Sequence, residues 1–356
     1  MEIIKIVLTG GPCAGKTTAL SSIKKYLFEN NIPIVTVPET ATELILNVQI
    51  PLNEETTYKF QSLVLKKQLS KEEIAEEYLR DIRNPEGKCV IIYDRGVLDN
   101  KAYLNNRKDI NTLLEKYNLT EIEALDSYDL VLDLLSLATC KKDAYNFSNK
   151  ARMEDVESAS KIDEKTSLAW IAHRNLKVID SSVSLEEETE IIINYVRELL
   201  EGVQTKHIRK FIVDDNLSNY KIYNDSNSEE LYITDYFIEG EDSSYNYVIS
   251  KREHNNDVSY VYNIYSVEGN KKTIRLDKKI TKEKYFELLI NNKLINKTER
   301  KEINFYYNKQ KYTLCFYGDY TILEIEDNNQ NKEIVFPGNL EITEELENGK
   351  ARVRKI

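Results

Sequence analysis

The sequence predicts two domains of different class: an α/β domain with a five-stranded parallel sheet at residues 1–203, followed by an antiparallel β-barrel at residues 204–356. Three observations support this prediction. In the first part, short apolar runs alternate with helical stretches, which is typical of a doubly wound parallel sheet. From about Lys206, alternation of polar and apolar residues and dense tyrosines indicate many antiparallel strands. The 356 residues are also enough for two domains, each with its own core.

The first predicted strand, Ile3–Leu8, leads into a glycine-rich loop and then a helix at residues 17–26. This is the P-loop pattern G-x-x-x-x-G-K-[ST] between a strand and a helix, and its backbone N–H groups are suited to bind nucleotide phosphates. We expect Lys16 to contact the β- and γ-phosphates and the Thr17 hydroxyl to bind Mg²⁺. The predicted nucleotide-binding residues are Gly10, Gly11, Pro12, Cys13, Ala14, Gly15, Lys16, Thr17 and Thr18. The predicted cofactors are Mg²⁺ with ATP or GTP, because a P-loop contacts phosphates and leaves the base open.

Two further predicted strands each end in an acidic residue. The strand at residues 32–37 is followed by Glu39, and the buried strand at residues 89–93 is followed by Asp94. Ligands of open α/β sheets bind at the carboxyl ends of the strands. Glu39 is therefore a candidate catalytic base toward an acceptor hydroxyl or a ligand of Mg²⁺-bound water, with helix capping as the alternative. Asp94 is a candidate catalytic carboxylate that orients Mg²⁺, with a structural ion pair as the alternative.

The rest of the first domain follows from periodicity. Residues 56–80 have helical spacing, and Gln61 on this helix either hydrogen-bonds an acceptor or is an ordinary solvated glutamine. Continuous apolar runs at residues 128–135 and 176–179 predict the fourth and fifth buried strands. An amphipathic helix at residues 185–200 closes the domain.

A polar, basic stretch lies between the fourth and fifth predicted strands. A lid that closes on phosphates carries arginines there, because a fixed guanidinium neutralises transition-state charge. We therefore expect Arg152 to be catalytic, whereas for Lys141 and Lys142 the alternative is a solvated charged face. Trp170 and His173, on the helix that follows, are expected to pack in the core.

The segments GGPCAGKTTAL, VPETATEL, FQSLVLKKQL, DRGVLDNKAY, YDLVLDL and ARMEDVESA occur in this order. Together they resemble the AAA-type and kinase-like P-loop family related to nicotinamide riboside kinases and nucleoside kinases, over almost all of residues 1–203. The resemblance implies a nucleoside- or nucleotide-kinase-like core, with Lys16 and Thr17 on phosphate and Mg²⁺ and Asp94 near the metal. It also implies that Glu39 is the catalytic carboxylate and that Arg152 belongs to the lid.

The second domain is predicted from alternation. Strands are expected at residues 208–214, 230–238, 246–252, 258–266, 272–277, 303–308, 311–317 and 320–326, with one helix near residues 282–290. If their polar faces point into a barrel, the interior is a basic tunnel with a metal site on Glu324 and Glu326, suited to a polyphosphate. The expected phosphate-binding residues of the tunnel are Lys210, Lys251, Arg252, Arg275 and Arg300. The alternative is a solvated exterior face.

The segments HIRKF, YVISKRE, TIRLDKKIT, ERKEINFYY, ILEIED and FPGNLEIT resemble the triphosphate tunnel metalloenzyme fold, also called CYTH-like, over residues 205–356. Its members are similar to thiamine triphosphatases and class IV adenylate cyclases. The family's opening strand carries Glu-x-Glu-x-Lys, whereas here Lys206 and Ile208 replace both acidic residues and only Lys210 remains. Because fewer carboxylates hold Mg²⁺ less well, the domain is expected to be a degenerate binding module.

The order of the two domains resembles that of a eukaryotic GTP-binding protein implicated in membrane-channel trafficking. This resemblance implies GTP as a candidate nucleotide and phosphoinositide-like phosphates as candidate ligands of the tunnel. It is a likeness of architecture, and function still has to be argued from the sites.

The composition excludes several classes of function. A net charge of −11 disfavours nonspecific binding to nucleic acid or an anionic membrane. The four cysteines form no C-x-x-C pair, so neither a zinc site nor a disulfide framework is expected, and a reduced, cytoplasmic setting fits. No apolar run reaches the length of a membrane span. Three functions remain open: a P-loop kinase or slow NTPase, a nucleotide-gated binding protein, and a metal-dependent triphosphatase in the second domain.

Overall fold

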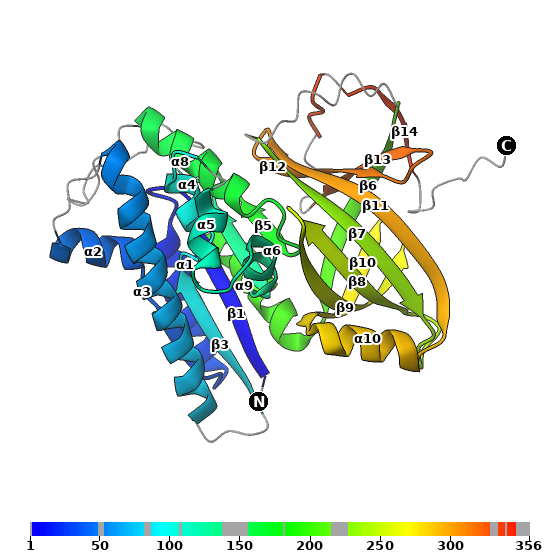
Figure 1. Ribbon diagram of the computed structural model, residues 1–356, viewed down its shortest axis with the longest axis horizontal. Coiled ribbons are helices and arrows are strands. Elements are labelled where there is room, and N and C mark those ends of the chain that lie inside the picture. The colour runs from blue at the N-terminus through cyan, green and yellow to red at the C-terminus, as the bar shows by residue number, and fades with distance from the viewer. Residues whose placement is uncertain are drawn as a thin grey trace. The chain divides into compact units, whose positions relative to one another are not determined.

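The computed structural model describes residues 2–48, 53–81, 87–106, 109–136, 156–180, 182–214, 227–327, 334–338 and 340–346. The chain divides into two compact units, Met1–Leu200 and Glu201–Ile356. The first unit contains a parallel sheet with helices and the second an antiparallel barrel, as the sequence predicts (Figure 1). Among the helices in these ranges, none combines the length and the apolar character that crossing a bilayer requires.

The first unit is built on a five-stranded parallel sheet with the order β2-β3-β1-β4-β5. Its strands are β1 (Glu2–Thr9), β2 (Ile34–Val37), β3 (Lys88–Asp94), β4 (Leu130–Leu134) and β5 (Leu176–Ile179). The helices of this unit are α1 (Lys16–Glu29), α2 (Thr40–Val48), α3 (Glu54–Asp81), α4 (Asp99–Tyr103), α5 (Asp109–Glu115), α6 (Glu121–Asp126), α8 (Val156–Ala169) and α9 (Leu185–Glu201).

The register of β1 brings two carboxylates to the edge of the sheet where the P-loop begins. Leu8 pairs with Asp94 on β3, and Thr9 pairs with Asp133 on β4. Because all five strands are parallel, their carboxyl ends meet at this one edge. The P-loop therefore lies at the same edge as the end of β3.

The apolar runs of β3 and β4 are continuous because helices cover both faces of the sheet. Ile92 and Leu132 are completely buried and belong to one core cluster. α1 contributes Ile23 and Leu27 to this cluster, and α9 contributes Val196. The helical spacing of these residues is the amphipathic pattern from which both helices were predicted.

The second unit is a closed barrel of eight antiparallel strands, in the order β10-β9-β8-β7-β11-β12-β13-β6, with β6 pairing back to β10. The strands are β6 (Gln204–Val213), β7 (Ser228–Ile238), β8 (Asn246–His254), β9 (Asp257–Glu268), β10 (Lys271–Ile280), β11 (Leu294–Tyr307), β12 (Gln310–Phe316) and β13 (Thr321–Glu326). A short strand, β14 (Ile342–Glu345), pairs with β6 outside the closed ring.

Two apolar clusters lie on the outside of the barrel wall. The helix α10 (Lys282–Asn291) packs on β8 and β9, and its Tyr285 joins a cluster with Ile249 (Figure 1). A second cluster includes Phe211 and Leu323 of the wall and Leu340 from the C-terminal segment. Because side chains alternate along a strand, the residues between these apolar positions point into the barrel. The inner face therefore carries charged residues such as Lys210 and Glu324, together with apolar residues such as Ile322.

The prediction for β11 was wrong about its start. The sequence indicated a strand from residue 303, whereas β11 begins at Leu294. From Asn296 on, the missed residues are polar on both faces, since Arg300 and Glu302 face the interior while Lys301 faces outward and pairs with Glu230. A strand without an apolar face gives no alternating pattern.

Candidate nucleotide-binding site

The P-loop takes a conformation that requires glycine. Gly10 has a φ of 126°, and a Cβ at this position would lie 2.0 Å from the carbonyl oxygen of Leu134. Gly15 has a φ of 80°, directly before α1. The N–H of Gly11 donates to Asp163 Oδ1 of α8 at 2.7 Å, which anchors the start of the loop. The remaining loop residues curve around the N-terminus of α1, where anions bind readily.

Lys16 folds back onto its own loop. Its Nζ donates hydrogen bonds to the carbonyl oxygens of Gly10 and Gly11, both at 2.9 Å. Burial lowers the pKa of Lys16 to about 8, and the nearby positive charge of Arg95 adds to this effect. An ammonium group held by two neutral carbonyls is able to exchange them for phosphate oxygens, which would also compensate its charge.

A cavity of about 460 Å³ opens beside the P-loop. Residues 12–18 form one part of its wall, and α2, α3 and α4 form much of the rest. Its lining beyond the P-loop consists of Glu39, Thr40, Ala41, Thr42, Ile45, Phe60, Gln61, Val64, Gln68, Asp94, Arg95, Asp99, Asn100 and Tyr103. The cavity thus has one end suited to phosphates and another that combines apolar, aromatic and amide side chains. Gln61 is buried and faces this second end instead of being solvated.

Arg95 joins two carboxylates in the cavity wall. Its Nε donates to Glu39 Oε1 at 2.8 Å, and its Nη1 donates to Asp99 Oδ1 at 3.0 Å. The backbone of Arg95 has a φ of 73°, in the left-handed region, and its carbonyl oxygen accepts a hydrogen bond from Gln68 at 3.0 Å. A strained conformation of a bulky residue persists only where many contacts hold it, and it is often found at functional sites.

Asp99 is the anchor of this arrangement. It is 3% exposed. Besides Arg95, it accepts hydrogen bonds from Thr9 Oγ1 at 2.5 Å, the N–H of Gly96 at 2.8 Å and Trp170 Nε1 at 3.2 Å. Every donor comes from a different position around the site, so Asp99 fixes the guanidinium of Arg95 relative to β1.

The electrostatics of Glu39 and Asp94 differ. Burial raises the pKa of Glu39, but the charge of Arg95 and a hydrogen bond from Thr42 at 2.8 Å outweigh it, so the pKa lies below its usual value. Burial raises the pKa of Asp94, with Lys16 opposing the shift. Glu39 is thus held ionised, whereas Asp94 lacks full compensation of its charge.

Asp94 also has an unsatisfied oxygen. Its Oδ1 is buried and has no hydrogen-bond partner within the described ranges. Thr17, at the start of α1, is exposed in the same cavity. An unpartnered carboxylate oxygen and a hydroxyl that face one cavity fit a Mg²⁺ ion held between them and nucleotide phosphates.

Some predicted residues lie elsewhere. Arg152, together with Lys141 and Lys142, lies outside the described residues. Trp170 and His173 are completely buried, as expected for packing residues.

Sequence reasoning did not single out Arg95, Asp99 or Gln68. The first two lie in the segment DRGVLDN, which was noted only as a whole. Their roles depend on contacts between β3, α3 and α4 that no local spacing reveals.

The barrel brings three of the five predicted tunnel cations to its inner face. Lys210 Nζ lies 2.7 Å from Glu324 Oε1, and Arg300 Nε lies 2.7 Å from Glu302 Oε1. Arg252 shares this face, because the register places it and Arg300 on either side of Ile233. The inner cations therefore lie among carboxylates.

Lys251 and Arg275 are not brought together with the other three. Lys251 neighbours Arg252 on β8 and so points to the opposite face, where its Nζ lies 2.9 Å from Glu253. Arg275 is exposed at a β-bulge of β10 and donates to the hydroxyl of Tyr245 at 3.3 Å.

The predicted carboxylate pair is engaged with lysines. Glu326 lies 3.9 Å from Lys206 Nζ, just as Glu324 contacts Lys210. Burial raises the pKa of Glu324, but the ammonium group of Lys210 outweighs it, so the pKa lies below its usual value.

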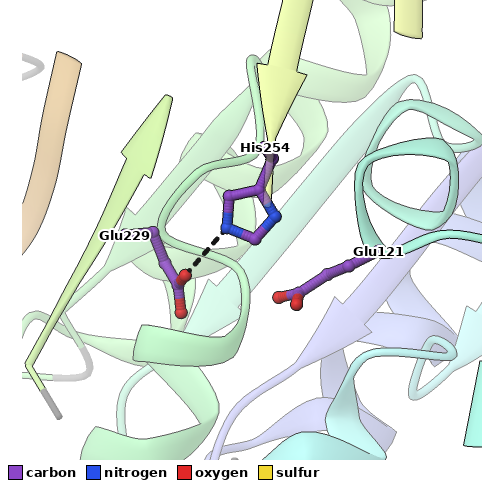
Figure 2. Close-up of side chains that lie close together, drawn as sticks. All are labelled: Glu121, Glu229 and His254. Atoms are coloured by element: carbon purple, nitrogen blue, oxygen red, sulfur yellow. Dashed lines mark hydrogen bonds and ion pairs between the residues drawn. The ribbon is translucent and has the colours of Figure 1, made fainter. Parts of the chain in front are cut away.

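A further polar contact of the barrel lies at the end of β8. His254 Nε2 is 3.1 Å from Glu229 Oε2 of β7, the hydrogen bond drawn in Figure 2. The two residues come from neighbouring antiparallel strands, so the bond links the ends of β7 and β8. It adds to the wall contacts of this part of the barrel.

The glycine loop, its lysine and the adjoining carboxylate of β3 define a P-loop nucleotide-binding protein. A family model described as AAA domain matches residues 5–188, more than half of the chain. The protein therefore belongs to the AAA domain family.

No curated protein matches the sequence. Among solved structures, the chain is similar to the PH1819 protein from Pyrococcus horikoshii OT3, with 16% sequence identity and a TM-score of 0.28. That alignment covers 36% of this chain and 80% of PH1819.

Proposed function

We propose that the first unit is a Mg²⁺-dependent phosphotransferase that moves a phosphoryl group from ATP or GTP to an acceptor hydroxyl. One observation carries this proposal: the cavity continues beyond the P-loop into a second end lined by Phe60, Gln61 and Tyr103. A protein that only binds a nucleotide's phosphates does not need this space. The resemblance to nucleoside kinases and nicotinamide riboside kinases supports the same conclusion.

The residues have the following proposed roles. The loop amides and Lys16 bind the donor phosphates, and Thr17 and Asp94 hold Mg²⁺, which neutralises charge on the β- and γ-phosphates when bound. Glu39 accepts the proton of the acceptor hydroxyl. Arg152 neutralises charge on the transferring group, a role that follows from its place in the lid sequence.

A second candidate function is a nucleotide-gated binding protein with slow turnover. The observation that favours it is the ion pair between Glu39 and Arg95, at 2.8 Å. A carboxylate with a lowered pKa is a weaker general base, so proton transfer would be slow unless acceptor binding breaks this pair.

For the second unit we propose a degenerate CYTH-like domain that binds a phosphorylated ligand. Lys210, Arg252 and Arg300 share the inner face and would contact phosphate, while Glu324 and Glu326 would hold a metal ion. Lys206 and Ile208 stand where the resemblance expects carboxylates. A metal-dependent triphosphatase is therefore the third candidate.

A phosphorus NMR time course tests these candidates. The protein is incubated with Mg²⁺ and ATP or GTP, with and without a mixture of nucleosides and nucleoside monophosphates. A new phosphate monoester or diphosphate that requires an acceptor supports the kinase. Acceptor-independent, slow release of inorganic phosphate contradicts it and supports the nucleotide-gated protein.

Variants assign the activity to one unit. Lys16→Ala should abolish turnover in either of the first two cases, whereas Lys24→Ala, an exposed lysine on the same helix, should not. Turnover that survives Lys16→Ala but is lost in Glu324→Gln would place the chemistry in the barrel.

A further inference from the structure

A second cavity of the first unit, of about 590 Å³, shares no lining residue with the nucleotide cavity. α3 contributes to both, because Gln61 and Gln68 line the first and Leu69 and Glu72 line the second. None of the roles proposed above uses this second cavity. Large cavities with a few convergent polar groups are the usual places for small ligands.

Glu72 is a carboxylate that lines this cavity. Its carboxylate accepts hydrogen bonds from the hydroxyl of Tyr128, at 3.0 and 3.1 Å, and from Gln68 Nε2 at 3.3 Å. Both donors are neutral, and no cation of the described chain lies within hydrogen-bond distance. Burial raises the pKa of Glu72 to about 7. A carboxyl group with this environment is a candidate for a functional site.

The cations that line the cavity do not contact Glu72, although the charge of Lys5 partly offsets the effect of burial on the pKa of Glu72. Lys5 of β1 and Arg80 of α3 both contact Glu76, Arg80 at 3.0 Å. Lys66 is exposed. The carboxylate of Glu72 therefore has no cation in direct contact among the described residues, and a ligand can supply one.

The remaining lining combines apolar and aromatic residues with two serines, Ser70 and Ser127, and a further carboxylate, Glu73. Leu69, Val97 and Leu119 contribute aliphatic surface, and Tyr117 and Tyr128 also line the cavity. Aliphatic surface favours an apolar stem, and tyrosine faces attract a cation. A ligand that has both features would match this lining.

We propose that this cavity binds a small organic amine, with its ammonium group on Glu72 and its apolar part against the aliphatic and tyrosine side chains. The amine supplies a counter-charge in direct contact with Glu72, which no cation of the described chain provides. Binding then favours the ionised form of Glu72, so a proton is released when the amine binds near neutral pH.

The test uses phenethylamine as the probe and the fluorescence of Trp170 as the signal. Trp170 is the single tryptophan of the sequence, and its ring packs on Tyr128 with centroids 5.5 Å apart. We expect saturable binding by the unliganded protein. The neutral analogue 2-phenylethanol should bind at least about tenfold more weakly, because it cannot form the charged hydrogen bond.

Variants and pH make the test specific. Glu72→Gln keeps the hydrogen-bonding shape and should weaken amine binding about tenfold or more, whereas Glu77→Gln, an exposed residue of the same helix, should not change it. In the wild type, affinity should rise up to about tenfold from pH 6 to pH 8, as Glu72 becomes ionised.

Three results would overturn the proposal. These are equal binding of the amine and the alcohol, unchanged amine affinity in a folded Glu72→Gln variant, and an affinity that does not rise between pH 6 and pH 8. The pH series uses only the wild type, so it decides the question even if the variant does not fold.

Discussion

Nucleotide affinity should decrease above about pH 8 because of Lys16. This side chain is proposed to contact the phosphates, and burial lowers its pKa to about 8. At pH 9 roughly one molecule in ten retains the charge, so the apparent Kd for MgATP should rise about tenfold between pH 7 and pH 9. The sign follows from linkage: the nucleotide prefers protonated Lys16, so binding takes up a proton, and affinity is lost as the pH rises through this pKa.

Isothermal titration calorimetry at pH 7 to 9.5, in buffers of different ionisation enthalpy, measures both the Kd and the proton uptake. Lys16→Arg is the matched control, because a guanidinium group stays protonated throughout this range. Its affinity should be independent of pH. A wild-type Kd that stays constant to pH 9.5, or a parallel decrease in affinity for Lys16→Arg, would refute the assignment.

Three further predictions concern stability and the loop. Gly10→Ala should abolish nucleotide binding and destabilise the first unit by about 2 kcal/mol or more, because the new Cβ would lie 2.0 Å from the carbonyl oxygen of Leu134. Normal MgATP binding in calorimetry would contradict this prediction. Leu132→Ala creates a cavity in the buried sheet core, so it should lower the free energy of unfolding by about 2–5 kcal/mol in urea titrations. A loss under 1 kcal/mol would show that the core tolerates this cavity. Glu324→Gln should lower the free energy of unfolding by about 1–2 kcal/mol, because Lys210 loses its ionic partner. The pKa of Glu324 lies below 4.5, so the stability advantage of the wild type should disappear as the pH falls below that value. Equal thermal stability of the two proteins at pH 7 would exclude a contribution from this ion pair.

The fold could be predicted where burial leaves a pattern in the sequence. β3 and β4 are buried on both faces, so their residues form continuous apolar runs, and the glycine loop has a fixed spacing. β11 was missed in part because one of its faces meets a polar interior and the other meets solvent. Periodicity detects a contrast between two faces, and here the contrast is absent.

The candidate site was predicted only in the parts that follow a strand directly. Glu39 and Asp94 were found because each follows a predicted strand. Arg95 was not, because its importance rests on a left-handed backbone conformation and on contacts with Asp99 and Gln68 from two helices. Such contacts between elements have no signature in a single sequence.

The apolar clusters outside the barrel wall have a consequence for synthesis of the chain. When residues 1–200 have left the ribosome, every strand of the parallel sheet exists, so the first unit can fold at once. The barrel cannot close before β13 is made, and Leu340 joins its outer cluster later still. The nascent barrel therefore exposes apolar wall residues until Leu340 has emerged, and chaperones are expected to act on this unit.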